Sequence, residues 1–398
     1  MTTDRAAISR RQLLQISTAA TLGFAAPALI GRAEAQVLPL RDGEILPTPN
    51  LDLKRGQYRR VAGLRPVRTG GVRLEVDPQL GRDAGKTVIH NYGHGGGGIT
   101  LSFGCAAKVV DFVRPLIAPA ANALQPRVAI IGSGIIGLTV AKELRDAFPQ
   151  LRIRVLTKSR SIEDSVSFIA GGQFAPSGIA QEYGARAREV LCPIITQSYA
   201  RLKRYTDSGE YPLYGVRFRK NYTLQAVEDL GLCALGALPA PKQGLLPFRN
   251  LRRPGFEYSA YLIEPPVMLR RLAHDLTAKK VPILWSHPIA DRRALLALPE
   301  TIIINCTGLG ARELVGDTGL KGVKGQLAVF DNPQHLKYLF SGGCGNGQIG
   351  YMFARNDDIV VGGTYETSFA NANPDPAVVE RILKRMDTVF KGQPDSCM

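Results

Sequence analysis

Glycine-rich turns are the part of this sequence whose residue types and spacing most clearly indicate chemistry. The run GSGIIG at residues 132–137 follows an apolar segment, 128–131, and precedes a helically spaced segment, 138–144. In a strand, turn and helix of this kind, the three glycines allow a tight turn, close approach of a pyrophosphate and close helix packing. The pyrophosphate then lies at the amino end of the helix. The predicted cofactor-binding residues of this turn are Gly132, Ser133, Gly134, Ile135, Ile136 and Gly137.

The end of the second strand of the unit, 153–156, does not show the residue expected to bind the ribose. An acidic residue that binds the ribose is expected at its end. The sequence there reads Thr157-Lys158-Ser159. Lys158 faces either an adenosine phosphate or solvent, and the sequence does not decide between them.

A second glycine cluster occupies residues 93–98, interrupted only by His94. It connects a short strand that starts at Val88 to a helix predicted over 101–113. A backbone without side chains can close its amides on a planar or anionic ligand. His90 and His94 lack partners for a metal, so we expect both to be hydrogen-bonding residues of the loop and predict no metal site. The predicted cofactor-binding residues here are Gly95, Gly96, Gly98, Ile99 and Thr100.

Composition and charge limit the classes of protein to which this chain can belong. The 398 residues are 45% hydrophobic and 21% charged, which suits one large or two ordinary globular domains. The net charge of +16 is spread along the chain without a long basic block or a nucleic-acid-binding motif. We therefore predict no nucleic-acid partner, and we interpret the charge as a solvated surface that draws in anionic substrates. The six cysteines have no metal-like spacing and are expected mainly in the core.

The amino terminus, residues 1–35, has the pattern of an export signal. Arg10 and Arg11 are paired, an apolar run with several small residues follows, and Ala33-Glu34-Ala35 forms a small-residue cleavage site. It resembles a twin-arginine (Tat) signal, which implies the Tat export machinery as a partner and a periplasmic or secreted protein. The apolar run is too short and interrupted for a confident membrane span, and we expect none in the mature chain. Residues 36–60 form an irregular lead-in.

Three motifs together resemble the FAD-dependent D-amino-acid oxidase family. They are GLRPVR at 63–68, VIHNYGHGGGGIT at 88–100, and VAIIGSGIIGLTVAKEL at 128–144. In that family the dinucleotide turn opens the chain and the other two motifs close it, whereas here the closing third comes first. The resemblance implies an α/β fold with an FAD-binding Rossmann-like domain and an antiparallel-sheet substrate domain, circularly permuted. The helix 101–113 returns the chain to where the strand at Val128 begins, so a short joint completes the permutation.

The same resemblance implies domain boundaries. Residues 61–180 belong mainly to the FAD-binding domain, comprising the permuted segment 61–113, the joint 114–126 and the dinucleotide-binding unit 127–180. Residues 181–300 belong mainly to the substrate domain. Residues 301–325 return to the FAD-binding domain, and 326–398 supply a substrate-domain hairpin and a C-terminal helix.

Further motifs place cofactor contacts along the later chain. Ala170, Gly171 and Gly172 resemble the family segment beside the flavin ring, where small residues leave room for substrate. Thr307 and Gly308 end an apolar strand that resembles the one returning to FAD. Helices are predicted over 189–205, 265–279 and 378–390, strands over 217–238 and 248–261, and a hairpin over 349–364.

Two residues match the family's carboxylate-binding positions. Arg65 is the predicted clamp, because a guanidinium can hold a carboxylate bidentately, and Tyr351 is predicted to donate a second hydrogen bond. A second family tyrosine is replaced here by Gly347, which leaves the side-chain pocket open to question. The implied reaction is oxidation of a D-amino acid to a 2-oxo acid and ammonia, with oxygen as acceptor and hydrogen peroxide as product.

Alternatives remain at this point. The chain is also compatible with a D-aspartate oxidase, a glycine or sarcosine oxidase, and a quinone-linked D-amino-acid dehydrogenase. A dicarboxylate substrate needs another cation, for which Arg355 and Lys324 are candidates. A flavin-binding module without turnover is the alternative outside enzymes, suggested by Gly347 and Lys158. The sequence fixes neither the oligomeric state nor the pairing of the cysteines.

Overall fold

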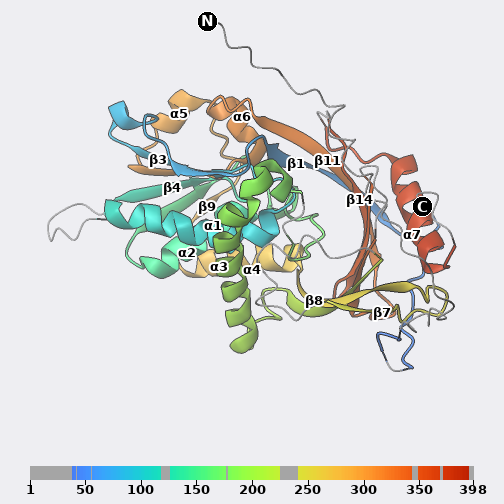
Figure 1. Cartoon of the computed structure of the whole chain (residues 1–398). Helices are drawn as coiled ribbons and strands as arrows, with labels where there is room; N and C mark the ends of the chain where they lie inside the picture. Colours follow the sequence, from blue (N-terminus) through green and yellow to red (C-terminus); the bar gives the residue numbers. More distant parts are fainter. Residues whose placement is uncertain are drawn as a thin grey trace, which may run out of the picture. The chain divides into compact units, whose positions relative to one another are not determined.

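The strands of this protein form two sheets (Figure 1). A computed structural model describes residues 38–41, 43–54, 56–117, 126–175, 178–224, 241–342, 348–367 and 371–393. One sheet has six strands in the order β2-β3-β10-β4-β5-β9, and the other has eight in the order β1-β11-β14-β13-β12-β6-β8-β7. The mixed α/β fold expected from the sequence is confirmed.

The six-stranded sheet contains the dinucleotide-binding unit. Its strands are β2 (Arg73–Val76), β3 (Thr87–Tyr92), β4 (Arg127–Ile131), β5 (Arg152–Leu156), β9 (Ile283–Leu284) and β10 (Ile302–Asn305). Only the edge strand β2 is antiparallel to its neighbour. A parallel sheet is covered on both faces, which explains the continuous apolar runs of β4 and β10. Strand β4, helix α2 and strand β5 confirm the predicted strand, glycine turn, helix and strand.

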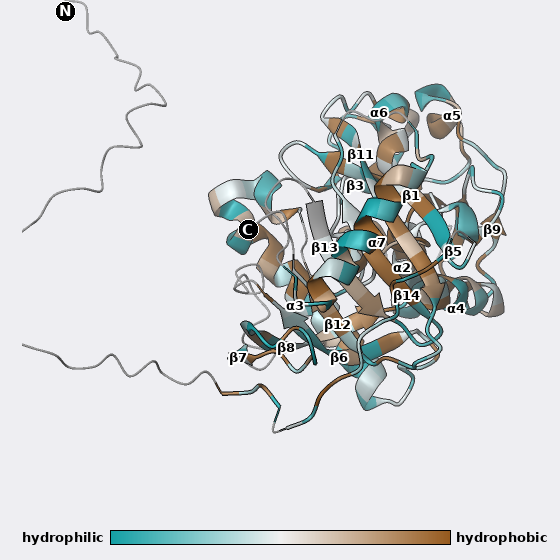
Figure 2. Ribbon diagram, turned by 90° about the vertical axis from the view of Figure 1, so that its right-hand side faces the viewer, coloured by the Kyte–Doolittle hydropathy of each residue, from teal (hydrophilic) through white to brown (hydrophobic). Residues whose placement is uncertain are grey.

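Helices cover both faces of this sheet. They are α1 (Gly98–Val113), α2 (Ile135–Ala147), α3 (Ala187–Asp207), α4 (Pro265–Ala278), α5 (Arg292–Leu296) and α6 (Ala311–Leu314). Helix α7 (Pro376–Phe390) belongs instead to the eight-stranded sheet. One apolar cluster joins α1, α2, α3 and α4 to the sheet, and another joins the opposite face to α5 and α6. Hydrophobic residues are concentrated on the inner strands, whereas hydrophilic residues predominate in the outer loops (Figure 2).

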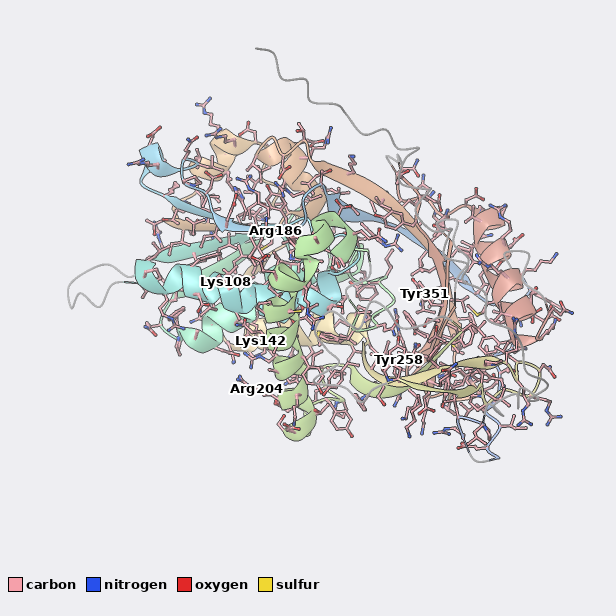
Figure 3. All side chains as sticks on the ribbon, viewed as in Figure 1. Lys108, Lys142, Arg186, Arg204, Tyr258 and Tyr351 are labelled. Atoms are coloured by element: carbon pink, nitrogen blue, oxygen red, sulfur yellow. The ribbon has the colours of Figure 1, made fainter. Side chains whose placement is uncertain are left out.

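The eight-stranded sheet has two different faces. Its strands are β1 (Arg59–Arg68), β6 (Val216–Thr223), β7 (Lys242–Leu245), β8 (Pro254–Ile263), β11 (Leu320–Asp331), β12 (Tyr338–Ser341), β13 (Gln348–Ala354) and β14 (Asp358–Thr364). Helix α7 packs on one face together with Met352 and Phe340. Because side chains alternate along a strand, Tyr351 and Phe353 lie on the other face. Figure 3 shows Tyr351 and Tyr258 on this sheet.

One sequence prediction about the sheets needs correction, and the pairing and packing of three further elements bear on the predicted domain boundaries. Strands β6 and β12 pair in parallel, so the second sheet is mixed rather than purely antiparallel; the long chain between them imposes no hairpin. Strand β1, assigned to the FAD-binding segment, pairs with β11 in the eight-stranded sheet. Helices α3 and α4, assigned mainly to the substrate domain, pack in the same apolar cluster as α1 and α2. Each placement depends on a strand pairing or an apolar contact between segments far apart in sequence, which local sequence does not encode.

Some predictions fall wholly or partly outside the described residues. The predicted signal, 1–35, lies outside them, as do residues 118–125 of the joint and 225–238 of a predicted strand. The described lead-in makes isolated bridges, such as Pro39 with Leu245, before β1 begins. In the described part of the chain, no helix combines the length and apolar character needed to cross a membrane.

Candidate active site

The dinucleotide turn is held by close backbone contacts. Gly132 has a φ of 112°, and a Cβ atom there would lie 2.5 Å from the carbonyl oxygen of Cys306. A Cβ atom at Gly137 would lie 2.0 Å from the carbonyl oxygen of Gly132. Gly134 differs, since its nearest neighbour would be Ser167 Oγ at 3.3 Å. Gly132 and Gly137 are therefore required by backbone packing, whereas a Cβ atom at Gly134 would meet only a side-chain hydroxyl, so packing alone does not require glycine there.

The remaining residues of this turn have separate functions. The Ser133 hydroxyl donates to Thr157 Oγ1 (2.9 Å) and ties the turn to the end of β5. The Ile135 amide donates to Ser167 Oγ (3.2 Å). The amides of Ile136 and Gly137 have no acceptor within the described residues. Since the first amides of a helix lack intrahelical partners, these two are available to an anion.

Helix α1 begins beside helix α2. A Cβ atom at Gly98 would lie 3.9 Å from Ile135 Cγ2, so the first residues of the two helices are adjacent. Neither helix has a side-chain cap at its amino end. Because each amino end carries a partial positive charge, their convergence favours a polyanionic ligand. The helix α1 starts at Gly98, three residues before the predicted start, so the glycine cluster itself supplies the first turn.

Other predicted contacts of this region have mixed outcomes. Gly95 donates its amide to the Pro66 carbonyl (2.8 Å), which fastens the cluster to β1. The Thr100 hydroxyl donates to the Ala175 carbonyl (2.7 Å) and accepts from the Ala175 amide (3.0 Å). This hydroxyl is therefore not a free donor for the cofactor. Gly96 lies in the glycine cluster, and Gly98 and Ile99 lie in the first turn of α1; their contact with the cofactor stays a prediction.

His94 is buried, and one of its ring nitrogens has no hydrogen-bond partner among the described residues. It is 3% exposed, and within the described residues its Nε2 makes no hydrogen bond. The expectation that its side chain bonds within the loop is therefore wrong for this atom. Burial lowers the pKa of His94 to about 3, which keeps the imidazole neutral. A buried polar atom without a partner is costly, and a cofactor seated at the glycine cluster is the kind of ligand that would supply one.

His90 belongs to a chain of hydrogen bonds behind the cluster. Thr307 donates its amide (3.2 Å) and hydroxyl (2.7 Å) to Asn305 Oδ1. Asn305 Nδ2 therefore faces His90 Nδ1 (3.4 Å) as donor, and His90 donates from Nε2 to Asp77 (3.0 Å). Backbone amides of Leu80 and Gln79 and the His90 ring outweigh burial and lower the pKa of Asp77 to about 2. This chain holds the turn at Thr307 and Gly308, where we predict cofactor contact.

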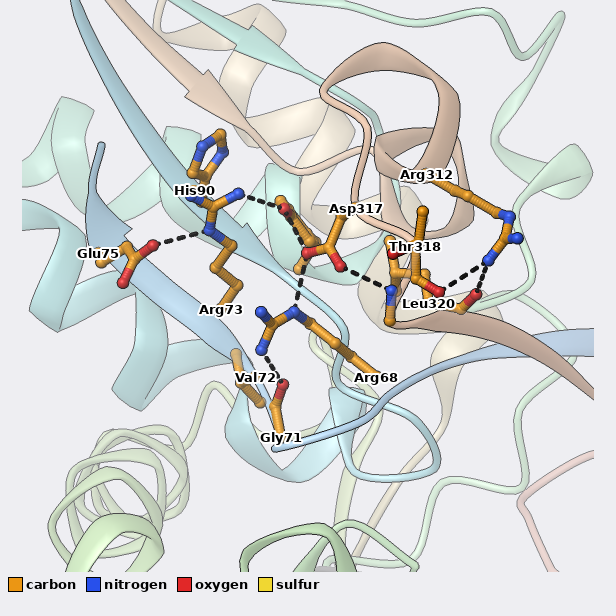
Figure 4. Close-up of polar contacts among 12 residues, drawn as sticks. Arg68, Gly71, Val72, Arg73, Glu75, His90, Arg312, Asp317, Thr318 and Leu320 are labelled. Atoms are coloured by element: carbon orange, nitrogen blue, oxygen red, sulfur yellow. Dashed lines mark hydrogen bonds and ion pairs between the residues drawn. The ribbon is translucent and has the colours of Figure 1, made fainter. Parts of the chain in front are cut away.

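Charged groups extend this chain across the early and late segments of the sequence (Figure 4). Arg73 contacts Asp77 (3.0 Å) and the Tyr92 hydroxyl (3.1 Å). The Tyr92 hydroxyl and Arg68 Nε both donate to Asp317 Oδ2, at 2.9 and 2.8 Å. The segment before the dinucleotide turn is thus bonded directly to the segment after β10.

The carboxylate-binding candidates come together on the eight-stranded sheet. Arg65 is half-buried on β1, donates to the Thr364 carbonyl (2.9 Å) and lies 5.9 Å above the ring of Tyr365. Burial raises the pKa of the Tyr351 hydroxyl, and the neighbouring Arg65 and Arg355 guanidinium groups act in the opposite direction. The structure therefore brings Arg65 and Tyr351 to one place, although they are far apart in sequence.

The loop containing Ala170, Gly171 and Gly172 crosses the same sheet face. A Cβ atom at Gly171 would lie 2.9 Å from Phe353 and 3.4 Å from Tyr351. The rings of Tyr351 and Phe353 stack at 4.4 Å. The loop therefore needs small residues in order to lie on these rings. This is a second reason for small residues, beside the prediction that they leave room for a ligand. The stacking position of Phe353 was not recognised in the sequence, where it reads as an ordinary strand residue.

The other residues singled out lie outside this constellation. Lys158 is exposed beyond β5. Lys324 is buried on β11, next to Gly325, whose missing side chain accommodates Arg65. Strand alternation places Lys324 on the face opposite Arg65. Gly347 lies outside the described residues. Cys105 and Cys306 are buried free thiols whose pKa is raised by burial, as expected of core residues.

Comparison with known proteins agrees with this geometry. Residues 127–396 match the model of the DAO family, described as FAD dependent oxidoreductase. A D-amino-acid oxidase of Streptomyces coelicolor is 29% identical over 266 residues, covering 65% of this chain and 76% of that protein. A D-amino-acid oxidase of Rubrobacter xylanophilus is 26% identical over 277 residues, with the same two shares. Glycine oxidase from Geobacillus kaustophilus shares the fold, with a TM-score of 0.51 at 17% identity over 66% of this chain and 77% of that chain.

Proposed function

Because this chain belongs to the FAD dependent oxidoreductase family, we propose that it oxidises D-amino acids. The proposed products are an imino acid, which hydrolyses to a 2-oxo acid and ammonia, and hydrogen peroxide formed when oxygen reoxidises the flavin. FAD dependence follows from the family, and the residues present fit that cofactor. Among the described residues, the two adjacent helix amino ends have no side-chain cap and His94 Nε2 makes no hydrogen bond, and a dinucleotide would supply partners to both.

The observation that carries the proposal is the meeting of Arg65 and Tyr351 opposite the small-residue loop. A guanidinium can bind a carboxylate with two parallel hydrogen bonds, and a phenol can add a third. The half-buried position of Arg65 strengthens such a contact, because charges interact more strongly away from water. An α-carboxylate held there fixes the α-carbon of an amino acid beside the loop.

In this scheme, residues of the chain position the substrate. When bound, FAD accepts the hydride from the substrate α-carbon. Arg65 and Tyr351 hold the carboxylate and so restrict the approach of the α-carbon. The short side chains of Ala170, Gly171 and Gly172 leave the adjacent face open. No strong side-chain base is required for hydride loss from a neutral amine.

A dicarboxylate substrate has less support. It needs a second cation near Arg65, and neither candidate supplies one. The buried Arg355 binds the carbonyl groups of Ala170 and Gly171. Lys324 lies on the opposite face of β11 and has interactions of its own. We therefore favour substrates with an uncharged side chain.

An anaerobic titration with D- and L-amino acids tests the proposal. Bleaching of the flavin absorbance by D-isomers only, with recovery in air, is the expected result. Bleaching that persists in air would indicate a dehydrogenase with another acceptor, such as a quinone. A yellow protein that no amino acid bleaches would contradict the proposal and favour a binding module without turnover.

We also propose that the protein is exported by the Tat route. The paired Arg10 and Arg11 and the cleavage pattern at Ala33–Ala35 support this proposal. Replacement of both arginines with lysine is expected to leave the protein in the cytoplasm. Export of that variant at the normal level would contradict the Tat route.

Circular permutation is a further part of the proposal. The family match starts at residue 127. Even so, β1 and β3, which precede it, pair directly with the matched strands β11 and β10. A reordered chain in which residues 38–117 follow residue 393 through a flexible linker tests this reading. It is expected to bind FAD as the natural order does, and a reordered chain that is soluble but binds none would contradict the permutation.

A further inference from the structure

Arg355 is a buried cation that the proposed reaction does not use. It follows β13 at the tip of a hairpin, and its side chain is only 5% exposed. Its Nη2 lies 2.5 Å from the Ala170 carbonyl oxygen and 3.3 Å from that of Gly171. Its acidic neighbour is farther away, with 3.5 Å between Nη1 and Asp358 Oδ1. The shortest contact of this guanidinium is therefore with loop backbone rather than with a carboxylate.

These contacts fix the direction of two peptide groups. In a trans peptide, the carbonyl and the following amide point to opposite sides of the chain. Binding of the Ala170 and Gly171 carbonyls to Arg355 therefore turns the amides of Gly171 and Gly172 away from Arg355. Neither amide has an acceptor within the described residues.

The loop is also fastened at both ends to the helices of the cofactor site. Ser167 Oγ accepts from the first residue of α2, and Ala175 is bonded to Thr100 of α1. Gly172 is held by its carbonyl, which accepts from the Ile263 amide (2.8 Å). Arg355 approaches the middle of the loop from the eight-stranded sheet, where no other side chain in the described part of the chain binds these two carbonyls.

We propose that Arg355 is a positioning residue for the flavin, which aims the Gly171 and Gly172 amides at the cofactor by holding the preceding carbonyls. This inference rests on the proposed function only in taking the loop to be a flavin contact. Amide donors aimed at a flavin stabilise the negative charge that its ring gains on reduction. Loss of Arg355 should then weaken FAD binding and lower the midpoint potential.

Replacement of Arg355 with Met or Lys tests the proposal. Arg355→Met removes every donor, whereas Arg355→Lys keeps the charge and a donor to one carbonyl. Arg312→Met is the matched control, because Arg312 Nη1 also donates to two carbonyls, those of Thr318 (2.9 Å) and Leu320 (2.8 Å), but away from this loop (Figure 4). The readouts are the FAD dissociation constant, the midpoint potential measured with redox dyes, and thermal unfolding.

For Arg355→Met we expect roughly tenfold weaker FAD binding and a shift in the reduction equilibrium of about tenfold, which is ~30 mV for a two-electron couple. Arg355→Lys should recover part of both, and Arg312→Met should change neither. An Arg355→Met protein with wild-type FAD affinity and potential, altered only in unfolding temperature, would overturn the proposal. If that variant does not fold, wild-type values in Arg355→Lys would overturn it. These readouts need no substrate, so failure of D-amino acids to reduce the wild-type flavin leaves this test intact.

Discussion

Substitution of Gly134 and Gly137 with alanine separates the needs of the protein from those of the cofactor. A Cβ atom at Gly137 would lie 2.0 Å from the backbone oxygen of Gly132, so α2 and the turn must move apart by about 1 Å. Overpacking of this kind costs about 1–3 kcal/mol. Gly134 has φ −70° and ψ 179°, which alanine adopts freely, and its nearest neighbour is the Ser167 hydroxyl at 3.3 Å, which would need to shift by only a few tenths of an ångström.

The two variants should therefore affect different properties: Gly137→Ala should lower stability, and Gly134→Ala should weaken FAD binding. Gly137→Ala is expected to lower the unfolding temperature of the flavin-free protein, by roughly 2–4 °C for each kcal/mol. Gly134→Ala should leave that temperature nearly unchanged, because the small loss from alanine at a helix cap is offset by reduced freedom of the unfolded chain. If a pyrophosphate lies against Gly134, the added methyl group should weaken FAD binding by the same 1–3 kcal/mol, roughly 5- to 150-fold.

Thermal unfolding of the flavin-free proteins and fluorescence titration with FAD measure both effects. Gly134→Ala with wild-type FAD affinity would refute the placement of the cofactor at this turn. Gly137→Ala with wild-type stability would refute the packing argument. The pair is informative because one variant serves as the control for the other.

Three further predictions concern the remaining site residues. Arg65→Ala should lower kcat/KM at least about a hundredfold without changing flavin content, since it removes two charge-assisted hydrogen bonds of about 1.5–3 kcal/mol each. A decrease of only a few-fold would contradict the role of Arg65 in carboxylate binding. Tyr351→Phe removes one hydrogen bond and should raise KM about tenfold, and an unaltered KM would show that the hydroxyl does not touch substrate. The third prediction concerns His94, whose pKa is about 3 in the folded protein and about 6.5 in the unfolded chain. Because the unfolded chain binds the proton first as the pH falls, the free energy of unfolding should decrease between pH 6.5 and pH 3. The loss from this group at pH 5 is about 2 kcal/mol, and in denaturant unfolding His94→Gln should show a correspondingly smaller loss between pH 7 and 5 than wild type.

Elements with strong local signals were predictable from the sequence. Gly132 and Gly137 specify a turn between β4 and α2 because each meets a backbone constraint that few other residues satisfy. Apolar spacing predicted α3, α4 and α7 closely, and the polar tip after Ala354 predicted the hairpin of β13 and β14. These features depend on neighbours within a few residues.

Features that depend on distant partners were not predictable. Strand β1 has the same alternation whichever sheet it joins, and its partner β11 begins about 250 residues later. Arg355 reads as part of an exposed polar turn, but the carbonyls of Ala170 and Gly171 provide its partners in the interior. His94 was expected to bond within its loop, yet its buried Nε2 makes no hydrogen bond with any described residue. In each case a contact remote in sequence decides the environment.

The arrangement of strands explains how a cofactor site can be assembled in this chain order. Strands β3 and β4 flank β10 and run parallel to it, so their carboxyl ends meet at one edge of the sheet. Helices α1 and α2 start at that edge after β3 and β4, and the Thr307 turn follows β10. Ligands of open α/β sheets bind outside such carboxyl ends. The site thus requires these three strands to be adjacent in space, and the order in which the chain visits them affects only the connections on the opposite edge.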